Sequence, residues 1–268
     1  MSDNIDNTIF PHHLYIDSSR RVSGTNTSFT YKVNIPFPNN FTRACICDAV
    51  IPKSYYNVAS PYNSLTITEL GLSTTVTMAE SNYSMDSNFP NNTSTITNVP
   101  FMNVLVTALN IASANLGHGW SYSMTFPNHK TVAQTGKFTF NVSGNTGQPT
   151  FTFSQNSLYE QLGFNANTSY TFSGNTLTSP NVIYLQSERT LFIHSDIIQN
   201  FDNNILQEIY VGQVAPFSSI IFNQQESFMH SHKFTNKETN IYMFRLSDEN
   251  DNDINLNGVT WNFTIVLF

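Results

Sequence analysis

Apolar and polar residues alternate with a period of two along much of the chain. The alternation is clearest over residues 28–35, where Phe29, Tyr31 and Val33 are separated by polar residues. It returns at Phe138–Val142, Tyr242–Leu246 and Trp261–Leu267. This period predicts β-strands with one buried face. Continuous apolar runs at 43–50, 182–185, 191–193 and 218–222 predict strands that are covered on both faces.

Helical signals are confined to the middle of the chain. Over Asn98–Asn115 the apolar residues are spaced like one helical face, with Pro100 in the first turn and Gly117 after the end. A second, shorter helix is predicted over Ser157–Phe164, where a serine precedes Glu160 and a glycine lies near the end. Both helices fall between the two strand-rich ends of the chain.

The predicted strands fall into two groups. The first 60 residues hold three, at His13–Asp17, Ser28–Ile35 and Arg43–Val50. The last 80 or so hold five or six, at Thr190–His194, Gln207–Val211, Ser218–Phe222, Phe228–Phe234, Asn240–Leu246 and Val259–Phe268. Together they make eight or nine strands, the number that a jelly roll needs. We therefore expect a mainly β protein: a single jelly-roll β-sandwich of residues 1–60 and 187–268, with an inserted, mostly β domain (61–186) that carries one or two short helices. The insertion would lie between the third and fourth jelly-roll strands.

Composition supports an all-β chain and excludes several classes of protein. Only 11% of residues are charged and the net charge is −7, whereas asparagine, serine and threonine make up about a third of the chain. These residues favour turns and strands over helix interiors. The longest basic run is Arg20-Arg21, so we expect no direct nucleic-acid binding. No apolar stretch is long enough to span a membrane, and the polar start of the chain predicts no signal peptide.

Motifs for catalysis or metal binding are weak. No hydrolase elbow, phosphate-binding loop or zinc-protease motif is present. His230 and His232 could form a metal pair on one strand face, but a third ligand at a sensible spacing is missing. Asp251, Asp253 and Asn255 have the spacing of a calcium loop, but its glycine and final glutamate are absent. The sequence therefore predicts no enzyme, no metal and no cofactor, and it predicts that Cys45 and Cys47 are core residues without a disulfide bond.

Aromatic residues are the candidate binding residues. Tyr55, Tyr56 and Tyr62 lie near two prolines where the jelly roll would lead into the insertion, and Trp120 lies within the insertion. Exposed aromatic side chains suit contacts with proteins or sugars, although these tyrosines could equally seal a domain junction. Residues 1–11 carry no core pattern, so they are either disordered or an arm that docks on a neighbour.

Four segments, in this order, resemble one protein family. They are Ile16–Arg21 followed by Phe29–Val33; Asp48–Val58; Leu158–Phe164; and Phe244–Asp248 followed by Leu256–Thr264. This combination is similar to the penton proteins, the minor capsid or vertex proteins of virophages, polinton-like viruses and related double-stranded DNA viruses of eukaryotes. The resemblance covers most of the chain.

The resemblance implies a structural viral capsid protein without catalytic residues. It would form homopentamers, or pentons, at the five-fold vertices of an icosahedral shell, with its insertion domain facing outward. The implied partners are other copies of the chain, the major capsid protein and, through the insertion, a host surface receptor or glycan. The implied location is the capsid vertex of the virion, after synthesis in the host cytoplasm. The alternative is a carbohydrate- or receptor-binding β-sandwich protein of a virion or cell surface, with Tyr55, Tyr56, Tyr62 and Trp120 as its stacking residues.

Overall fold

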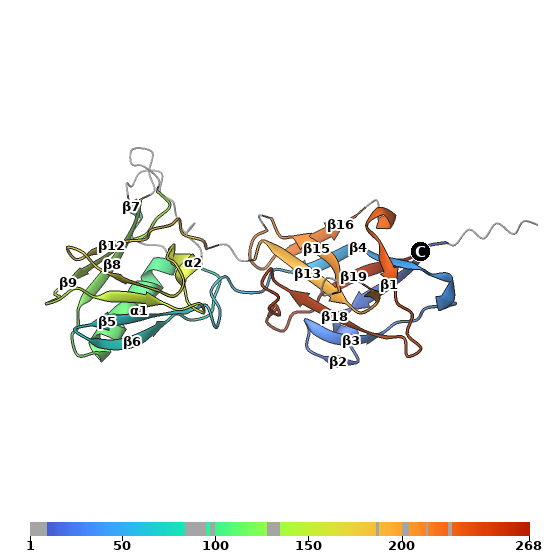
Figure 1. Ribbon diagram of the computed structural model, residues 1–268, viewed down its shortest axis with the longest axis horizontal. Helices are drawn as coiled ribbons and strands as arrows, with labels where there is room; N and C mark the ends of the chain where they lie inside the picture. Colours follow the sequence, from blue (N-terminus) through green and yellow to red (C-terminus); the bar gives the residue numbers. More distant parts are fainter. Residues whose placement is uncertain are drawn as a thin grey trace, which may run out of the picture. The chain divides into compact units, whose positions relative to one another are not determined.

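The chain folds into two compact units with separate hydrophobic cores. Unit 1 consists of residues 1–55 and 188–268, and unit 2 consists of residues 56–187. Our computed structural model describes residues 10–83, 95–96, 100–127, 135–185, 188–199, 204–212, 214–224 and 227–268. The chain leaves unit 1 after its third long strand and returns to it for the fourth (Figure 1). Residues 56–60, which the sequence assigns to the jelly roll, belong to unit 2.

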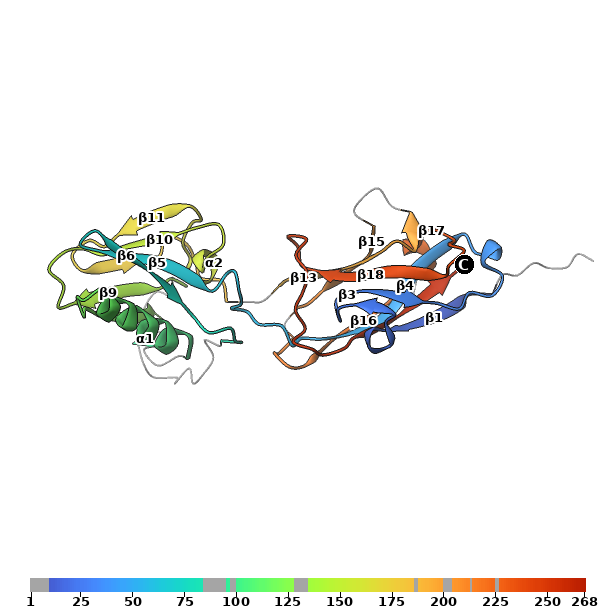
Figure 2. The same cartoon turned by 90° about the horizontal axis from the view of Figure 1, so that it is seen from below.

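Unit 1 is built from two antiparallel sheets that lie as two layers (Figure 2). The first sheet contains β1 (His12–Asp17), β19 (Asn262–Leu267), β4 (Arg43–Pro52), β16 (Ser219–Asn223), β17 (His232–Phe234) and β14 (Ile198–Gln199). The second contains β2 (Ser23–Gly24), β3 (Ser28–Lys32), β18 (Ile241–Ser247), β13 (Thr190–Ser195) and β15 (Ile205–Tyr210). Short 3-10 helices follow β1 and β3, at Ser18–Arg20 (η1) and Pro38–Asn40 (η2), and a third, η3 (Ser227–His230), precedes β17.

The pairing of these strands is that of a jelly roll. The first long strand pairs with the last, β1 with β19, and the second with the second-to-last, β3 with β18. Likewise β4 pairs with β16 and β17, and β13 pairs with β15. This nested pairing is a long hairpin rolled into two sheets. The predicted fold class is therefore confirmed: the chain is mainly β, and its terminal segments close into one jelly-roll sandwich.

The core of unit 1 is made by the inward-facing residues that the sequence pattern marks. Phe29, Phe244 and Phe263 are buried at its centre, and Trp261 stacks on Phe263 with ring centroids 4.8 Å apart. The Trp261 indole donates a hydrogen bond to the backbone carbonyl of Asn26. The large aromatic residues thus hold the two sheets together by area burial and ring contact.

Unit 2 is a smaller sandwich with one helix along its side. One sheet has the strand order β11 (Thr168–Thr171), β10 (Thr150–Phe153), β5 (Ser64–Glu69), β6 (Leu72–Thr77). The other has the order β12 (Thr176–Thr178), β9 (Thr139–Ser143), β8 (Ser121–Pro127), β7 (Thr95–Ile96). The helix α1 (Pro100–Asn115) packs against β8 of one sheet and β6 of the other (Figure 2). Phe101, Leu105 and Leu109 are buried, as the helical spacing predicts, whereas Val104, which the same spacing places on this face, is 36% exposed.

The second predicted helix is the single turn α2 (Tyr159–Leu162). It ends at Gly163, whose φ is 73°. A Cβ atom at this position would lie 2.4 Å from the carbonyl oxygen of Asn181, so only glycine fits here. Ser157 does not cap this helix, because its hydroxyl donates to the carbonyl of Ser154 instead.

Two predicted strands are not formed as the sequence suggests. Residues 182–185 have no regular secondary structure. The run Phe228–Phe234 divides into η3 and the short strand β17. The Ser231 hydroxyl donates to the Phe228 carbonyl and accepts a hydrogen bond from Arg43, and such local side-chain bonds favour a turn over a strand.

Candidate assembly surfaces

Unit 1 has two opposite edges, each formed by neighbouring chain segments. At one edge the chain crosses from β1 in the first sheet to β2 and β3 in the second. At the other edge it crosses from β15 in the second sheet to β16, η3 and β17 in the first. We call these the β1–β3 edge and the β15–β17 edge. Edge strands of a sandwich carry unpaired backbone groups and are its natural contact sites.

The β1–β3 edge exposes large apolar side chains. Phe10, directly before β1, is 79% exposed. More than half of each of the side chains Tyr15, Val22 and Phe37 is also exposed. The loop that carries Phe37 lies beside the start of β1, since His12 Nε2 is 3.3 Å from the carbonyl oxygen of Asn34. Phe10 and Phe37 therefore lie near the same end of this edge, and Tyr15 and Val22 lie farther along it.

The β15–β17 edge also exposes apolar side chains. Five side chains are more than half exposed: Tyr210, Phe217, Ile221, Phe228 and Met229. Between β15 and η3 lies a cleft of about 500 Å³, lined by residues that include Phe192, Leu206 and Met229. His232 also lines it, and burial, followed by the nearby Arg43 charge, lowers the pKa of this imidazole. Gln207, Glu208, His230 and Ser231 also line the cleft, so its lining mixes polar and apolar side chains.

Two of the exposed phenylalanines have left-handed backbone conformations. Phe37 has a φ of 52° and Phe217 a φ of 63°, one at each edge. A bulky residue in this region of backbone space is uncommon because its Cβ crowds the following carbonyl. Each side chain is also more than three-quarters exposed, so its strained backbone is not offset by burial of the ring.

The aromatic residues singled out from the sequence are placed differently from what was expected. Tyr55 is 4% exposed in the core of unit 1, and Trp120 is 3% exposed in the core of unit 2. Neither can stack on a ligand, so this part of the prediction is wrong. Tyr56 and Tyr62 are half-buried and belong to unit 2, and their proposed role stays a prediction.

Neither of the two candidate metal clusters has its side chains arranged around a common point. His230 lies in η3 and His232 in β17, so the pair does not share a strand face. In the acidic loop, Arg245 pairs with both Asp251 and Asp253. Asp248 accepts hydrogen bonds from the backbone of Asn250 and Asn252. Among the described residues, no group of three or more histidine, cysteine, aspartate or glutamate side chains could hold a metal ion.

Unit 2 contains one buried carboxylate that the sequence pattern does not predict. Glu69, at the end of β5, is fully buried. It accepts hydrogen bonds from Tyr122 OH at 2.7 Å and Ser113 Oγ at 2.9 Å, and His118 Nδ1 lies 2.9 Å from the same oxygen as Ser113. Ser113 and His118 both bind the carboxylate, and the Ser113 hydroxyl also accepts a hydrogen bond from the Trp120 backbone N–H. Ser113 therefore donates to no general base that could activate it as a nucleophile. The cluster joins β5, α1 and β8, which makes it structural.

The two cysteines form no disulfide bond. Burial is the main cause that raises the pKa of the Cys47 thiol to about 12, and the hydrogen bond to Asp48 adds to it. A thiol with so high a pKa is a poor nucleophile near neutral pH. Cys47 therefore gives no sign of catalytic activation.

One apolar run in the sequence belongs to the β15–β17 edge, although its pattern predicts a different environment. The run Ser218–Phe222 predicts a strand covered on both faces. In the structure Ile220 is buried whereas Ile221 is 74% exposed. A continuous apolar run on an edge strand therefore marks an uncovered apolar face, which becomes visible only once the strand's place at the sheet edge is known.

No protein-family model and no curated protein sequence matches the chain. Among solved structures, the crystal structure of a selenomethionine-labelled mavirus penton protein is similar, with a TM-score of 0.44 and 10% identity over 96% of this chain and 99% of that chain. A 3.5 Å cryo-EM structure of the Sputnik virophage is similar with a TM-score of 0.40 and 13% identity, over 97% of each chain. The first is a penton protein, the class that the four sequence segments resemble. No helix in the described part of the chain has the length and apolar character of a membrane span.

Proposed function

We propose that this protein is a non-enzymatic structural capsid protein that assembles into homopentamers at the five-fold vertices of an icosahedral viral shell. The observation that carries the proposal is the presence of exposed apolar side chains at both opposite edges of the jelly roll. The four segments that resemble penton proteins, and their order along the chain, support the same function.

A ring of identical subunits needs two different surfaces on each subunit. A two-fold dimer uses one patch twice, whereas a closed ring joins one face of a subunit to another face of its neighbour. The β1–β3 edge and the β15–β17 edge meet this requirement, because they lie on opposite sides of the sandwich and both are apolar. Apolar residues at an interface core stabilise such contacts by the area they remove from water.

The two edges are also complementary in shape. The β15–β17 edge carries a cleft, and the β1–β3 edge carries the protruding aromatic rings of Phe10 and Phe37. An aromatic side chain that fills a pocket of the partner is a common anchor of protein interfaces. In the proposed ring, an aromatic side chain of one subunit fills the cleft of the next.

In this proposal the remaining surfaces of unit 1 meet the major capsid protein, and unit 2 faces outward from the virion, where it can meet a host surface. The protein would be made in the host cytoplasm and reside in the virion. Unit 2 suits an outer position because it is a compact body inserted between two strands of the jelly roll.

The mass of the purified full-length chain, measured by size-exclusion chromatography with light scattering, tests this proposal. We expect a species of five copies, and five-fold rings in negative stain. Tyr210→Ser at one edge and Phe10→Ser at the other should each weaken assembly at least tenfold, because each large apolar side chain buried at an interface contributes about 1.5–3 kcal/mol.

Ile111→Ser is the matched control, since Ile111 is a similarly exposed apolar residue on α1 of unit 2. This variant should assemble like the original chain. A monomer at every concentration and salt condition would refute the pentamer. Rings that tolerate both edge variants would show that the edges are not the interface.

A further inference from the structure

The outer face of the β11-β10-β5-β6 sheet in unit 2 is a lattice of hydroxyl groups. Strand register places Thr171, Thr150, Thr68 and Ser73 in one row, and Ser169, Thr152, Thr66 and Thr75 in the next. Ser64 and Thr77 are paired in a third row. All are at least partly exposed, whereas the intervening residues Leu65, Ile67, Phe151 and Phe153 are buried.

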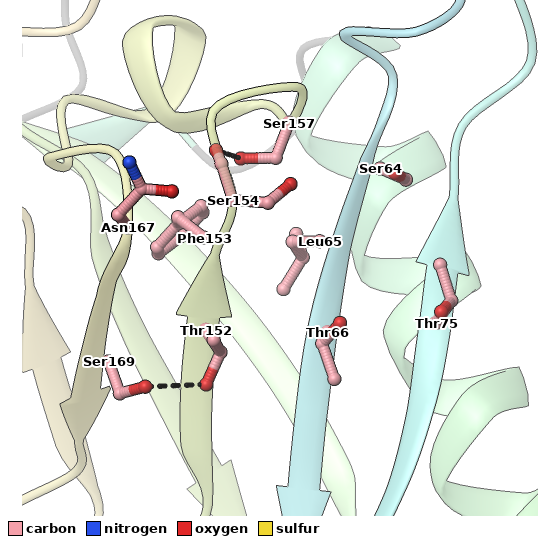
Figure 3. Close-up of a pocket in the computed structure, with 10 residues that line it drawn as sticks. All are labelled: Ser64, Leu65, Thr66, Thr75, Thr152, Phe153, Ser154, Ser157, Asn167 and Ser169. Atoms are coloured by element: carbon pink, nitrogen blue, oxygen red, sulfur yellow. Dashed lines mark hydrogen bonds between the residues drawn. The ribbon is translucent and has the colours of Figure 1, made fainter.

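Part of this face is hollowed into a pocket of about 470 Å³ (Figure 3). Its polar lining comes from all four strands and from the turn after β10: Ser64, Thr66, Thr75, Thr152, Ser154, Ser157, Asn167 and Ser169. The volume falls within the range of roughly 300–1,000 Å³ that small-molecule sites occupy. The pocket is therefore large enough for a small polar ligand.

Three hydroxyl groups in the pocket differ from those beside it in their hydrogen bonding. In the first row they are paired across the strands, Thr150 with Thr171 at 2.9 Å and Thr68 with Ser73 at 2.8 Å. In the pocket Thr152 pairs with Ser169 at 2.8 Å. The hydroxyls of Ser64, Thr66 and Thr75 have no hydrogen-bond partner among the residues that the structure describes, although Thr66 and Thr75 are opposite each other in register. These groups remain free to donate and to accept.

Charge is almost absent from unit 2. Residues 56–187 contain six charged side chains, Glu69, Glu80, Asp86, Lys130, Lys137 and Glu160. Glu69 is buried, and none of the six lines the pocket. An anionic ligand would find no cation in the pocket lining, and an apolar ligand would leave the hydroxyl groups unpaired.

We propose that this pocket binds a neutral saccharide. Each serine or threonine hydroxyl both donates and accepts, and the Asn167 amide offers its oxygen and the N–H that does not donate to Gln155 Oε1, which lies 3.4 Å from Asn167 Nδ2. The hydroxyl groups of an uncharged sugar also both donate and accept, so they match this lining. Unit 2 thus binds sugar through hydroxyl and amide groups, and the tyrosine and tryptophan residues singled out from the sequence do not line the pocket.

Saturation-transfer difference NMR on the full-length chain tests the site with a panel of neutral disaccharides and sialylated oligosaccharides. We expect saturable binding of at least one neutral disaccharide and none of the sialylated ones. Thr66→Val removes a hydroxyl at constant shape and should raise Kd at least tenfold. Asn167→Asp keeps a residue type that tolerates the positive φ of 54° but removes the amide N–H donors, and it should raise Kd at least tenfold.

Thr139→Val is the matched control. Thr139 is a strand threonine on the other sheet of unit 2, with its hydroxyl 3.0 Å from that of Thr178, and its replacement should leave Kd within twofold. Failure of every neutral disaccharide to bind, binding of sialylated sugars alone, or equal losses in Thr66→Val and Thr139→Val would overturn the proposal. The mass of the same sample reports assembly separately, so failure of sugar binding and failure of pentamer formation are distinguishable.

Discussion

At the scale of single residues, the buried carboxylate of Glu69 is the group that most needs hydrogen-bond partners. An unpaired buried charge would be very costly, so its three neighbours are required. Tyr122, Ser113 and His118 come from β8, from the last turn of α1 and from the segment between them. The cluster thereby fixes the helix end against both sheets of unit 2.

Replacing Tyr122 tests this role. Tyr122→Phe leaves one carboxylate oxygen without its donor and should lower the free energy of unfolding by about 1–3 kcal/mol. Burial, followed by the hydrogen bond to Glu69, raises the pKa of Tyr122. The folded protein therefore keeps a proton that the unfolded chain releases near pH 10, so stability should fall as the pH rises above about 10.

The measurement is urea unfolding of the full chain at pH 8 and at pH 11. The original protein should lose more stability between these two values than Tyr122→Phe does, because the variant lacks the phenol. Tyr62→Phe, at a half-buried position, is the control and should behave like the original protein. An unchanged alkaline loss in Tyr122→Phe would contradict the assignment.

At the scale of elements, three of the four segments that resemble penton proteins meet one another in unit 1, whereas Leu158–Phe164 lies in unit 2. Trp261 donates its backbone N–H to Ser18 Oγ, which joins the last segment to the first. Ser54 Oγ donates to the Leu256 carbonyl, and Asn257 Nδ2 donates to the Ser54 carbonyl, which joins the last segment to the second. These residues close the sandwich, so the resemblance is carried by residues that build the fold.

The edge elements carry a different prediction, based on the left-handed backbone of Phe217. Glycine adopts this conformation freely, so the substitution removes roughly 1–2 kcal/mol of backbone strain. It also adds conformational entropy to the unfolded chain, which costs roughly 0.5–1 kcal/mol of stability. Phe217→Gly should therefore leave the stability of the monomer equal or slightly higher, whereas assembly should weaken at least tenfold. Thermal unfolding and light scattering measure the two effects.

The control for this variant is Leu70→Gly. Leu70 is also exposed and has a φ of 48°, but it lies in the turn between β5 and β6 of unit 2. It should show the same small change in stability without any loss of assembly. Equal assembly of the two glycine variants would remove Phe217 from the interface.

At the scale of the whole molecule, the two units have separate cores. The core of unit 2 centres on a cluster of phenylalanines, in which the Phe140 ring lies 5.2 Å from that of Phe151 and 6.1 Å from that of Phe164. The core of unit 1 contains Phe263 and Trp261 instead. Because each unit buries its own apolar surface, each can unfold as its own cooperative body.

Scanning calorimetry of the full chain should accordingly show two transitions. Phe140→Ala should destabilise one of them by about 3–5 kcal/mol and leave the other in place, while Phe263→Ala should do the reverse. Each variant serves as the control for the other. A single transition that both variants lower equally would show that the units unfold together.

The sequence by itself determined most of the jelly-roll strands, where α1 lies and that the two ends of the chain form a jelly roll. Periodicity is a local property: it records which side of each strand is covered, and the strands near both ends supply the number that a jelly roll needs. Phe29, Tyr242 and Phe263 are buried as their alternation predicts. The cap residue Gly163 was likewise readable from its place after a short helical run.

Only the tertiary structure decided the exposure of individual side chains. Tyr55 and Trp120 are buried and Phe217 and Ile221 are exposed, because a residue's cover comes from segments far away in the chain. The partners of Glu69 lie 44 to 53 residues away, and the hydroxyl rows of unit 2 depend on the register of four strands. Burial and register are set by long-range packing, so neither the assembly edges nor the saccharide pocket is encoded in a local pattern.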